Sequence, residues 1–150
     1  MVMENKFVLP KVEQVAIIVK DVELTAAYLS STLGIGPFRI SERSGETMVY
    51  GKRTLAKRRL GIAEMGGIDL ELIQGLEAGT PYYDFINGRG EGLQHIRFAP
   101  VGDLNRTVGY LEEKGFKLVY GGEHAGGRFA YMESEMAKGF ILEFVKRAKS

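Results

Sequence analysis

The feature that most constrains the fold is an internal repeat. The stretch from Gln14 to Asp21 matches the stretch from His95 to Asp103, with one extra residue in the second copy. Each stretch is a β-rich run that ends at an aspartate, and a Tyr-Leu pair follows seven residues later. Each copy then reaches an apolar run that contains a glutamate, Glu71 or Glu143. Two copies of one structural unit are the simplest explanation.

Each copy predicts a strand, then a helix, then several short strands. Asp21 and Asp103 are suited to accept hydrogen bonds at the start of a helix, and Gly34 and Gly115 are suited to end one. Apolar residues recur at helical spacing between them. The strands predicted after the helices span about 38–41, 47–52, 57–64 and 68–73 in the first copy, and about 117–121, 128–132 and 140–146 in the second.

This pattern predicts one α+β domain over residues 1–150. Two βαβββ modules, about 11–76 and about 93–146, are joined by a linker of about 77–92. Thr80 and Pro81 open a short helix within that linker. We expect the mixed sheet to curve into an open cup, with the helices covering its outside.

Composition narrows the functional classes. Twenty basic and nineteen acidic residues give a net charge of +1, which disfavours nucleic acid as a partner. No cysteine is present, so a metal would have to use histidine and carboxylate or amide oxygens. No apolar run reaches the length of about 20 residues that a membrane helix needs, and the N-terminus is too polar for a signal peptide. We therefore expect a cytoplasmic protein with no membrane partner.

Glu143 is the sharpest single signal, because it is one carboxylate in a strand that is otherwise apolar. A buried charge needs a cation, a metal or a raised pKa. The alternative is an edge strand on which Glu143 lies in water or pairs with Lys146 or Arg128. Glu71 has the same two interpretations, and Asp69 beside it favours a solvated strand face.

The repeat links these glutamates to two further residues. Gln14 and His95 begin equivalent strands, and Glu71 and Glu143 lie in equivalent strands near the module ends. Taken alone, His95 would be a structural histidine and Gln14 would carry no signal. If the modules pack about a pseudo-twofold axis, all four side chains converge. Such a set suits a divalent metal ion such as Zn, Ni, Co, Mn or Mg.

At this point the sequence resembles the vicinal oxygen chelate superfamily, which includes glyoxalase I, methylmalonyl-CoA epimerase, bleomycin-resistance proteins and extradiol dioxygenases. The resemblance runs from about Lys11 to Val145, and its strongest stretches are 12–19, 68–73, 90–98 and 139–144. It implies paired βαβββ modules in the glyoxalase/bleomycin-resistance/dioxygenase fold, with a metal on the inner face of the cup. The family's ligand positions fall on Gln14, Glu71, His95 and Glu143.

The surroundings of His95 are most like the epimerase branch. That branch usually has His-His where this chain has Gln94-His95, and usually has histidine where Gln14 stands. Glutamine there, combined with Glu, His and Glu, is instead like one form of glyoxalase I. The sequence therefore leaves the epimerase and glyoxalase branches both open.

The resemblance implies an isomerase, epimerase or isomerising lyase that shuttles a proton α to a carbonyl. Glu143, with Glu71 as its partner, resembles the catalytic base, and the substrate is expected to be a small molecule with vicinal oxygens. Glu46 is a further candidate base, although a solvated turn residue is the simpler interpretation. The resemblance also implies a homodimer.

Two alternatives remain on the same fold. A binding or resistance protein would hold a ligand without chemistry, although such proteins usually lose the acids. An extradiol dioxygenase needs two histidines and a carboxylate, and the only histidines in this sequence are His95 and His124.

Two further segments each have two interpretations. The basic run 52–59 is either an anion-holding rim or an exposed hairpin, and the glycine-rich stretch 121–127 is either a lid or a connecting loop.

Overall fold

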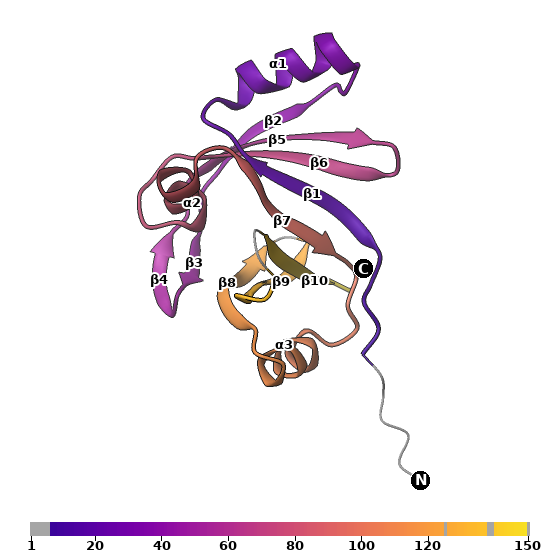
Figure 1. The fold of residues 1–150 in the computed structure, drawn as a ribbon, viewed down its shortest axis with the longest axis vertical. Coiled ribbons are helices and arrows are strands. Elements are labelled where there is room, and N and C mark those ends of the chain that lie inside the picture. The colour runs from indigo at the N-terminus through magenta and orange to yellow at the C-terminus, as the bar shows by residue number, and fades with distance from the viewer. Residues whose placement is uncertain (1–6, 125, 138–139, 150) are drawn as a thin grey trace.

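The structure is a computed structural model that describes residues 7–124, 126–137 and 140–149. Within these ranges the chain forms one curled mixed sheet of ten strands with three helices (Figure 1). The strands are β1 (Val12–Ile18), β2 (Arg39–Arg43), β3 (Glu46–Val49), β4 (Lys52–Leu55), β5 (Arg58–Met65), β6 (Ile68–Gly75), β7 (Gly92–Phe98), β8 (Lys117–His124), β9 (Gly127–Glu133) and β10 (Ile141–Arg147). The helices are α1 (Val22–Leu33), α2 (Pro81–Arg89) and α3 (Leu104–Glu113).

The sheet topology reflects the repeat. The strand order is β2-β5-β6-β1-β7-β10-β9-β8-β3-β4. The first strands of the two modules, β1 and β7, pair antiparallel at the centre. Each then pairs in parallel with the last strand of its own module, β6 or β10. The predicted half-barrel of paired βαβββ modules is thereby confirmed.

The helices begin where the sequence predicts. Oδ1 of Asp21 accepts a hydrogen bond from the backbone N–H of Leu24 at 2.9 Å, and Oδ1 of Asp103 accepts one from Arg106 at 3.0 Å. These bonds satisfy amide groups that have no partner within the helix. The hydroxyl of Thr80 does the same for α2.

The stretch 47–52 is not a single strand, and that prediction was wrong. The chain turns at Tyr50 and Gly51, whose φ angles are 48° and 78°, and β3 and β4 form a hairpin. The hairpin leaves the first module and pairs with β8 of the second, where the Thr47 hydroxyl donates to the Gly121 carbonyl at 2.7 Å. A turn of two positive φ angles is typical of a tight hairpin, but only Gly51 signals it in the sequence.

The glycine-rich stretch 121–127 is likewise neither a lid nor a simple loop. Strand β8 continues through His124, and β9 begins at Gly127. Residue 125 and the side chain of His124 lie outside the described part of the structure.

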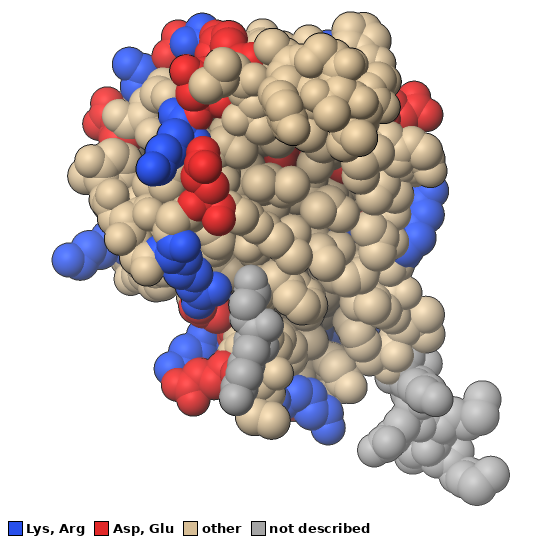
Figure 2. Space-filling view, turned by 45° about the horizontal axis from the view of Figure 1, so that its top comes forward, with Lys and Arg blue, Asp and Glu red and all other residues tan. Residues whose placement is uncertain are grey.

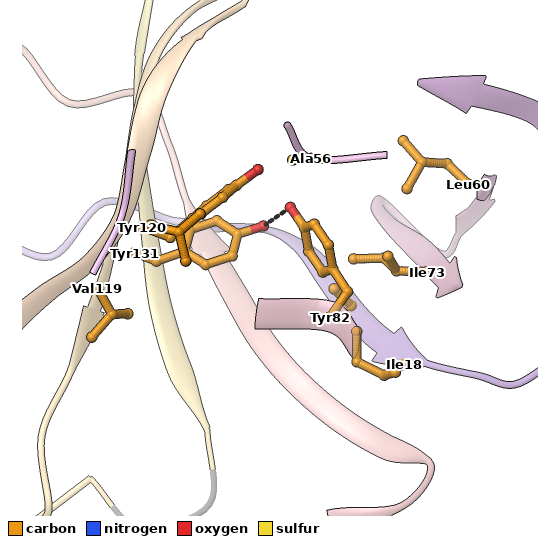
Figure 3. Close-up of a cluster of buried hydrophobic side chains, with 10 residues drawn as sticks. Ile18, Ala56, Leu60, Ile73, Tyr82, Val119, Tyr120 and Tyr131 are labelled. Carbon is orange, nitrogen blue, oxygen red and sulfur yellow. Dashed lines mark hydrogen bonds between the residues drawn. The ribbon is translucent and has the colours of Figure 1, made fainter. Parts of the chain in front are cut away.

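The core has one cluster on the inner face of the curled sheet and two on the outer face. Helix α1 covers one outer cluster, and α3 covers the other. The inner cluster contains residues of both modules and of α2 (Figure 3), and its buried members are Ala16, Ile18, Val49, Ala56, Leu60, Ile73, Tyr82, Val119, Tyr120 and Tyr131. The linker helix thus helps to close the cup.

The surface view in Figure 2 shows no large patch of one sign of charge on that face. On the face shown in Figure 2, basic and acidic residues lie intermixed around a broad uncharged area. This distribution agrees with the net charge of +1. No helix in the described ranges is long and apolar enough to cross a membrane.

The close packing of α2 on β6 can be tested at two glycines. A Cβ atom on Gly75 would lie 2.8 Å from the backbone N of Tyr83, whereas one on Gly88, within α2, meets nothing within 4 Å. We predict that Gly75→Ala lowers the free energy of unfolding by about 1–3 kcal/mol. We expect the control Gly88→Ala to be neutral or to stabilise by up to about 1 kcal/mol. Urea denaturation measures both; equal effects would contradict this packing.

Candidate functional site

Strand register brings the four candidate residues onto the inner face. Ala16 on β1 lies between Glu71 on β6 and His95 on β7. Gln14 shares the face of Ala16, since side chains two residues apart on a strand point the same way. On the other side, β10 places Glu143 beside Arg97 of β7, two residues beyond His95.

The four side chains lie close together and are nearly inaccessible to water. The exposed fractions of Gln14, Glu71, His95 and Glu143 are 1%, 6%, 0% and 3%. Nε2 of His95 lies 3.1 Å from Oε2 of Glu143 and 3.8 Å from Oε1 of Glu71. Nε2 of Gln14 donates to Oε2 of Glu71 at 3.4 Å. The structure therefore gathers all four residues into one cluster.

The neighbour of His95 fixes the orientation of its ring. Oε1 of Gln94 lies 3.0 Å from Nδ1 of His95, and both side chains are fully buried. Because the amide oxygen can only accept, Nδ1 of His95 carries a proton. The ring of Tyr131 packs against the imidazole with a centroid distance of 4.7 Å. Nε2 is thereby directed towards the two carboxylates.

Two buried atoms of this cluster lack hydrogen-bond partners among the described residues. They are Oε1 of Gln14 and Nε2 of His95, although Nε2 lies 3.1 Å from Oε2 of Glu143 and pairs with it when His95 is protonated. A buried acceptor without a partner is costly. Oε1 of Gln14 is an acceptor, and Nε2 of His95 offers a lone pair when it carries no proton. Together with the two carboxylates, these atoms match the ligand preferences of a divalent cation. The donor set therefore fits a metal ion.

The described side chains do not form a finished metal site. No group of three or more His, Asp or Glu side chains in these ranges is already arranged to hold an ion. The carboxylate of Glu143 is instead engaged by Arg97. Nε of Arg97 donates to Oε2 at 2.8 Å, and Nη2 donates to Oε1 at 3.4 Å.

Arg97 is the site residue that the sequence reasoning missed. The alternative interpretation of Glu143 proposed Lys146 or Arg128 as its partner, and both proposals were wrong because Arg97 is the partner. One signal was available: Arg97 lies two residues after His95 and therefore shares its face. Its identification as the partner required the register of β10 against β7.

The two glutamates have opposite pKa shifts. Burial raises the pKa of Glu71, and His95 and Arg97 offset this only in part. Burial would also raise the pKa of Glu143, but His95 and the hydrogen-bonded guanidinium of Arg97 lower it to about 2. Glu143 is therefore held ionised, whereas Glu71 binds a proton more readily than an exposed glutamate.

The remaining candidates lie away from this cluster. Glu46 is the first residue of β3, is exposed and pairs with Arg53 at 3.5 Å. In the basic run, the side chains of β4 are mostly exposed, whereas Arg58 is half-buried and lies over the ring of Tyr82. Residues 52–59 therefore fit neither expectation completely, because only the part in β4 is an exposed hairpin.

A hollow of about 1120 Å³ reaches the inner face next to the cluster. Among its lining residues are Ile141 and Glu133, and Ile141 is in register with His95. Both signs of charge line it, with Arg89, Lys114 and Lys117 as cations. A second hollow, of about 640 Å³, lies beside α3. None of the four residues lines either hollow, and only the larger one reaches a register neighbour of the cluster, Ile141. The larger hollow is the better candidate for the substrate.

Comparison with known proteins agrees with this architecture. The family model described as the glyoxalase/bleomycin resistance protein/dioxygenase superfamily matches residues 13–131. No curated protein matches the sequence significantly.

Among solved structures, methylmalonyl-CoA epimerase from Mycobacterium tuberculosis is similar, with 20% identity and a TM-score of 0.67 over 98% of this chain and 94% of that one. A variant epimerase from Streptomyces coelicolor, in complex with 2-nitronate-propionyl-CoA, has 20% identity and a TM-score of 0.69 over 95% and 100% of the two chains. A mutant 4-hydroxymandelate synthase from the same organism has 16% identity and a TM-score of 0.67 over 94% of this chain and 39% of its own. At these identities the similarity shows the fold.

The opposite pKa shifts predict opposite effects of two conservative substitutions. In the presence of a chelator at pH 7, Glu143→Gln should lower the free energy of unfolding by roughly 2–4 kcal/mol, because it leaves the Arg97 guanidinium without its anion. Glu71→Gln should raise it, because it removes a carboxylate that is poorly solvated when ionised.

Urea denaturation between pH 3 and pH 8 measures both effects and their pH dependence. The stabilisation from Glu143 is complete above its ordinary pKa near 4.5 and is lost as the pH falls towards 2. Glu71→Gln should raise the free energy of unfolding by a larger amount as the pH rises, because the wild-type carboxyl is then increasingly ionised. Destabilisation by Glu71→Gln at pH 7 would contradict the described electrostatics.

Proposed function

Because the chain belongs to the glyoxalase/bleomycin resistance protein/dioxygenase superfamily, we propose that it is a divalent-metal-dependent isomerase, epimerase or isomerising lyase. The reaction moves a proton on a carbon α to a carbonyl group. The observation that carries this proposal is the convergence of Gln14, Glu71, His95 and Glu143, from four strands of two modules, in one buried cluster.

These four residues would hold the metal through an amide oxygen, an imidazole nitrogen and two carboxylates. The unpartnered Oε1 of Gln14, and the position of Nε2 of His95 between the two carboxylates, support their assignment as ligands. Gln94 supports it further, since a hydrogen bond to the other ring nitrogen orients a ligating histidine. When bound, the cation supplies Lewis-acid stabilisation of the negative charge that develops on the substrate oxygens.

The proton itself is carried by the carboxylates. One carboxylate takes the proton from the α carbon, and the C–H electron pair moves into the carbonyl to give an enolate or enediolate. Glu71 and Glu143 lie on opposite sides of His95, on β6 and β10. Return of the proton to the opposite face gives an epimer, and return to the neighbouring carbon gives the glyoxalase outcome.

The different environments of the two carboxylates support a division of roles. Glu71 has the raised pKa and is the better proton carrier, whereas Glu143 is held ionised by Arg97. A pair of acids whose pKa values are pushed apart is the usual arrangement for acid–base catalysis.

The substrate in this proposal is a small molecule with vicinal oxygens, bound in the large hollow that is lined by Ile141, the register neighbour of His95. The structurally similar epimerases include one solved with methylmalonyl-CoA. The cations Arg89, Lys114 and Lys117 could each pair with an anionic group of the substrate, although Asp84, Glu133 and Glu135 line the same hollow.

We also propose that the chain is a single domain that forms a homodimer. The two modules act as one domain, since β1 and β7 share a ladder and the β3–β4 hairpin crosses to the second module. A homodimer is the proposed assembly. Light scattering coupled to size exclusion should give twice the mass of 16.6 kDa, and a monomer at micromolar concentration would contradict this part.

The proton shuttle predicts isotope exchange. With Co²⁺ or Zn²⁺ present, wild-type protein in deuterated buffer should catalyse deuterium incorporation at the α carbon of a responsive acyl-CoA or 2-hydroxy ketone. We expect Glu71→Gln and Glu143→Gln each to reduce that exchange by at least about 100-fold. Glu46→Gln serves as the control and should exchange normally. NMR follows the reaction, and undiminished exchange in both site variants would rule out their role as bases.

The metal assignment predicts stabilisation by divalent cations. One equivalent of Zn²⁺, Ni²⁺, Co²⁺ or Mn²⁺ should raise the melting temperature of the wild-type protein. His95→Ala should lose most of this shift, because it removes a nitrogen ligand. Thermal unfolding with and without chelator measures it. If no cation stabilises the wild type, the alternative of a ligand-binding protein without metal chemistry is favoured.

A further inference from the structure

The two halves of the site differ at one position of the repeat. Gln14 and His95 are equivalent, so Ala16 is the counterpart of Arg97. Ala16 stands beside Glu71, and Arg97 stands beside Glu143, in corresponding registers. One carboxylate therefore has a methyl group as its neighbour, whereas the other has a guanidinium.

The guanidinium is held in place from both sides. Its Nε and Nη2 bind the two oxygens of Glu143, at 2.8 and 3.4 Å. Its Nη1 lies 3.6 Å from Oε1 of Glu13, and Glu13 is itself paired with Arg147. Alternating charges thus run from the buried cluster to the surface. The chain Glu143–Arg97–Glu13–Arg147 limits how far Arg97 can move away.

We propose that Arg97 is a built-in counter-ion that competes with a divalent cation for Glu143 and so sets the metal affinity of the site. This inference rests on the proposed function, because it requires that Gln14, Glu71, His95 and Glu143 bind a metal. Arg97 is a positioning residue here, since it acts through Glu143 and not on the substrate.

Arg97 would compete with a metal ion because it already binds the carboxylate of Glu143. Both oxygens of Glu143 already accept from Arg97, and Oε2 also faces Nε2 of His95 at 3.1 Å. A cation bound to Glu143 must share these oxygens or displace the guanidinium. It would also lie near a fixed positive charge in a site where water screens little. Oε1 of Gln14, by contrast, has no hydrogen-bond partner among the described residues to give up.

The arrangement also explains how the cluster exists without metal. Two buried carboxylates with no cation would repel each other and would be poorly solvated. Arg97 neutralises Glu143, and Glu71 is left with a raised pKa. The residue that balances the buried charge of Glu143 is thus the same residue that would oppose a cation there.

The test is a titration of the chelator-treated protein with Co²⁺ in 10 mM buffer, followed by visible absorption and calorimetry. Arg97→Gln removes the charge, and we expect it to lower the dissociation constant at least about tenfold. Arg97→Lys keeps the charge and should remain within about threefold of the wild type. The control Arg53→Gln makes the same change of net charge on the exposed hairpin and should leave the constant unchanged.

A further variant keeps the test decisive if Arg97→Gln does not fold. Glu13 is partly exposed and offsets the charge of Arg97 from outside the cluster. Glu13→Gln should therefore weaken Co²⁺ binding, by about two- to fivefold at low salt, and the effect should fade at 0.5 M salt. An unchanged dissociation constant in this variant would overturn the proposal.

The outcomes separate this inference from the proposed function. If wild type and Arg97→Gln bind Co²⁺ equally well, or if Arg97→Gln binds more weakly, Arg97 does not compete with the metal and only the present inference fails. If no variant binds Co²⁺ at millimolar concentration, the metal site itself fails. The counter-ion role is supported if Arg97→Gln binds Co²⁺ more tightly than the wild type while Arg97→Lys and Arg53→Gln do not.

Discussion

The antiparallel pairing of β1 with β7 is the interaction on which the rest of the structure depends. It joins the first strands of two equivalent modules, so Gln14 and His95 point into the same cup from neighbouring strands. The parallel partners β6 and β10 then add Glu71 and Glu143, one on each side. Slipping that central ladder by one residue would turn the side chains of one module to the opposite face. The register of one ladder thus determines whether a site exists.

The four buried polar side chains have different partners in the two halves of the site. Glu143 has Arg97, and His95 has Gln94. Among the described residues, Glu71 has weaker partners, a long hydrogen bond from Gln14 at 3.4 Å and Nε2 of His95 at 3.8 Å. The half of the site with Glu71 is therefore the less compensated one. This asymmetry arises within a nearly symmetric backbone, because side chains at equivalent positions have diverged.

The repeat made the fold and the membership of the cluster predictable. Because Gln14 and His95, and likewise Glu71 and Glu143, occupy equivalent positions, their convergence follows once the modules are paired. The hairpin crossing to β8 was not predictable, since nothing local to Tyr50 and Gly51 indicates a partner strand more than sixty residues away. The pairing of Arg97 with Glu143 was missed for the same reason, because it depends on a ladder between distant segments.

The central claim is that the four converging side chains bind one divalent cation. Anomalous diffraction from crystals of the wild-type protein grown with Zn²⁺ tests it most directly. The account predicts a single strong peak within bonding distance, about 2.0–2.3 Å, of Nε2 of His95 and of carboxylate oxygens from Glu71 and Glu143. A fully occupied peak elsewhere on the molecule, with none in this cluster, would contradict it.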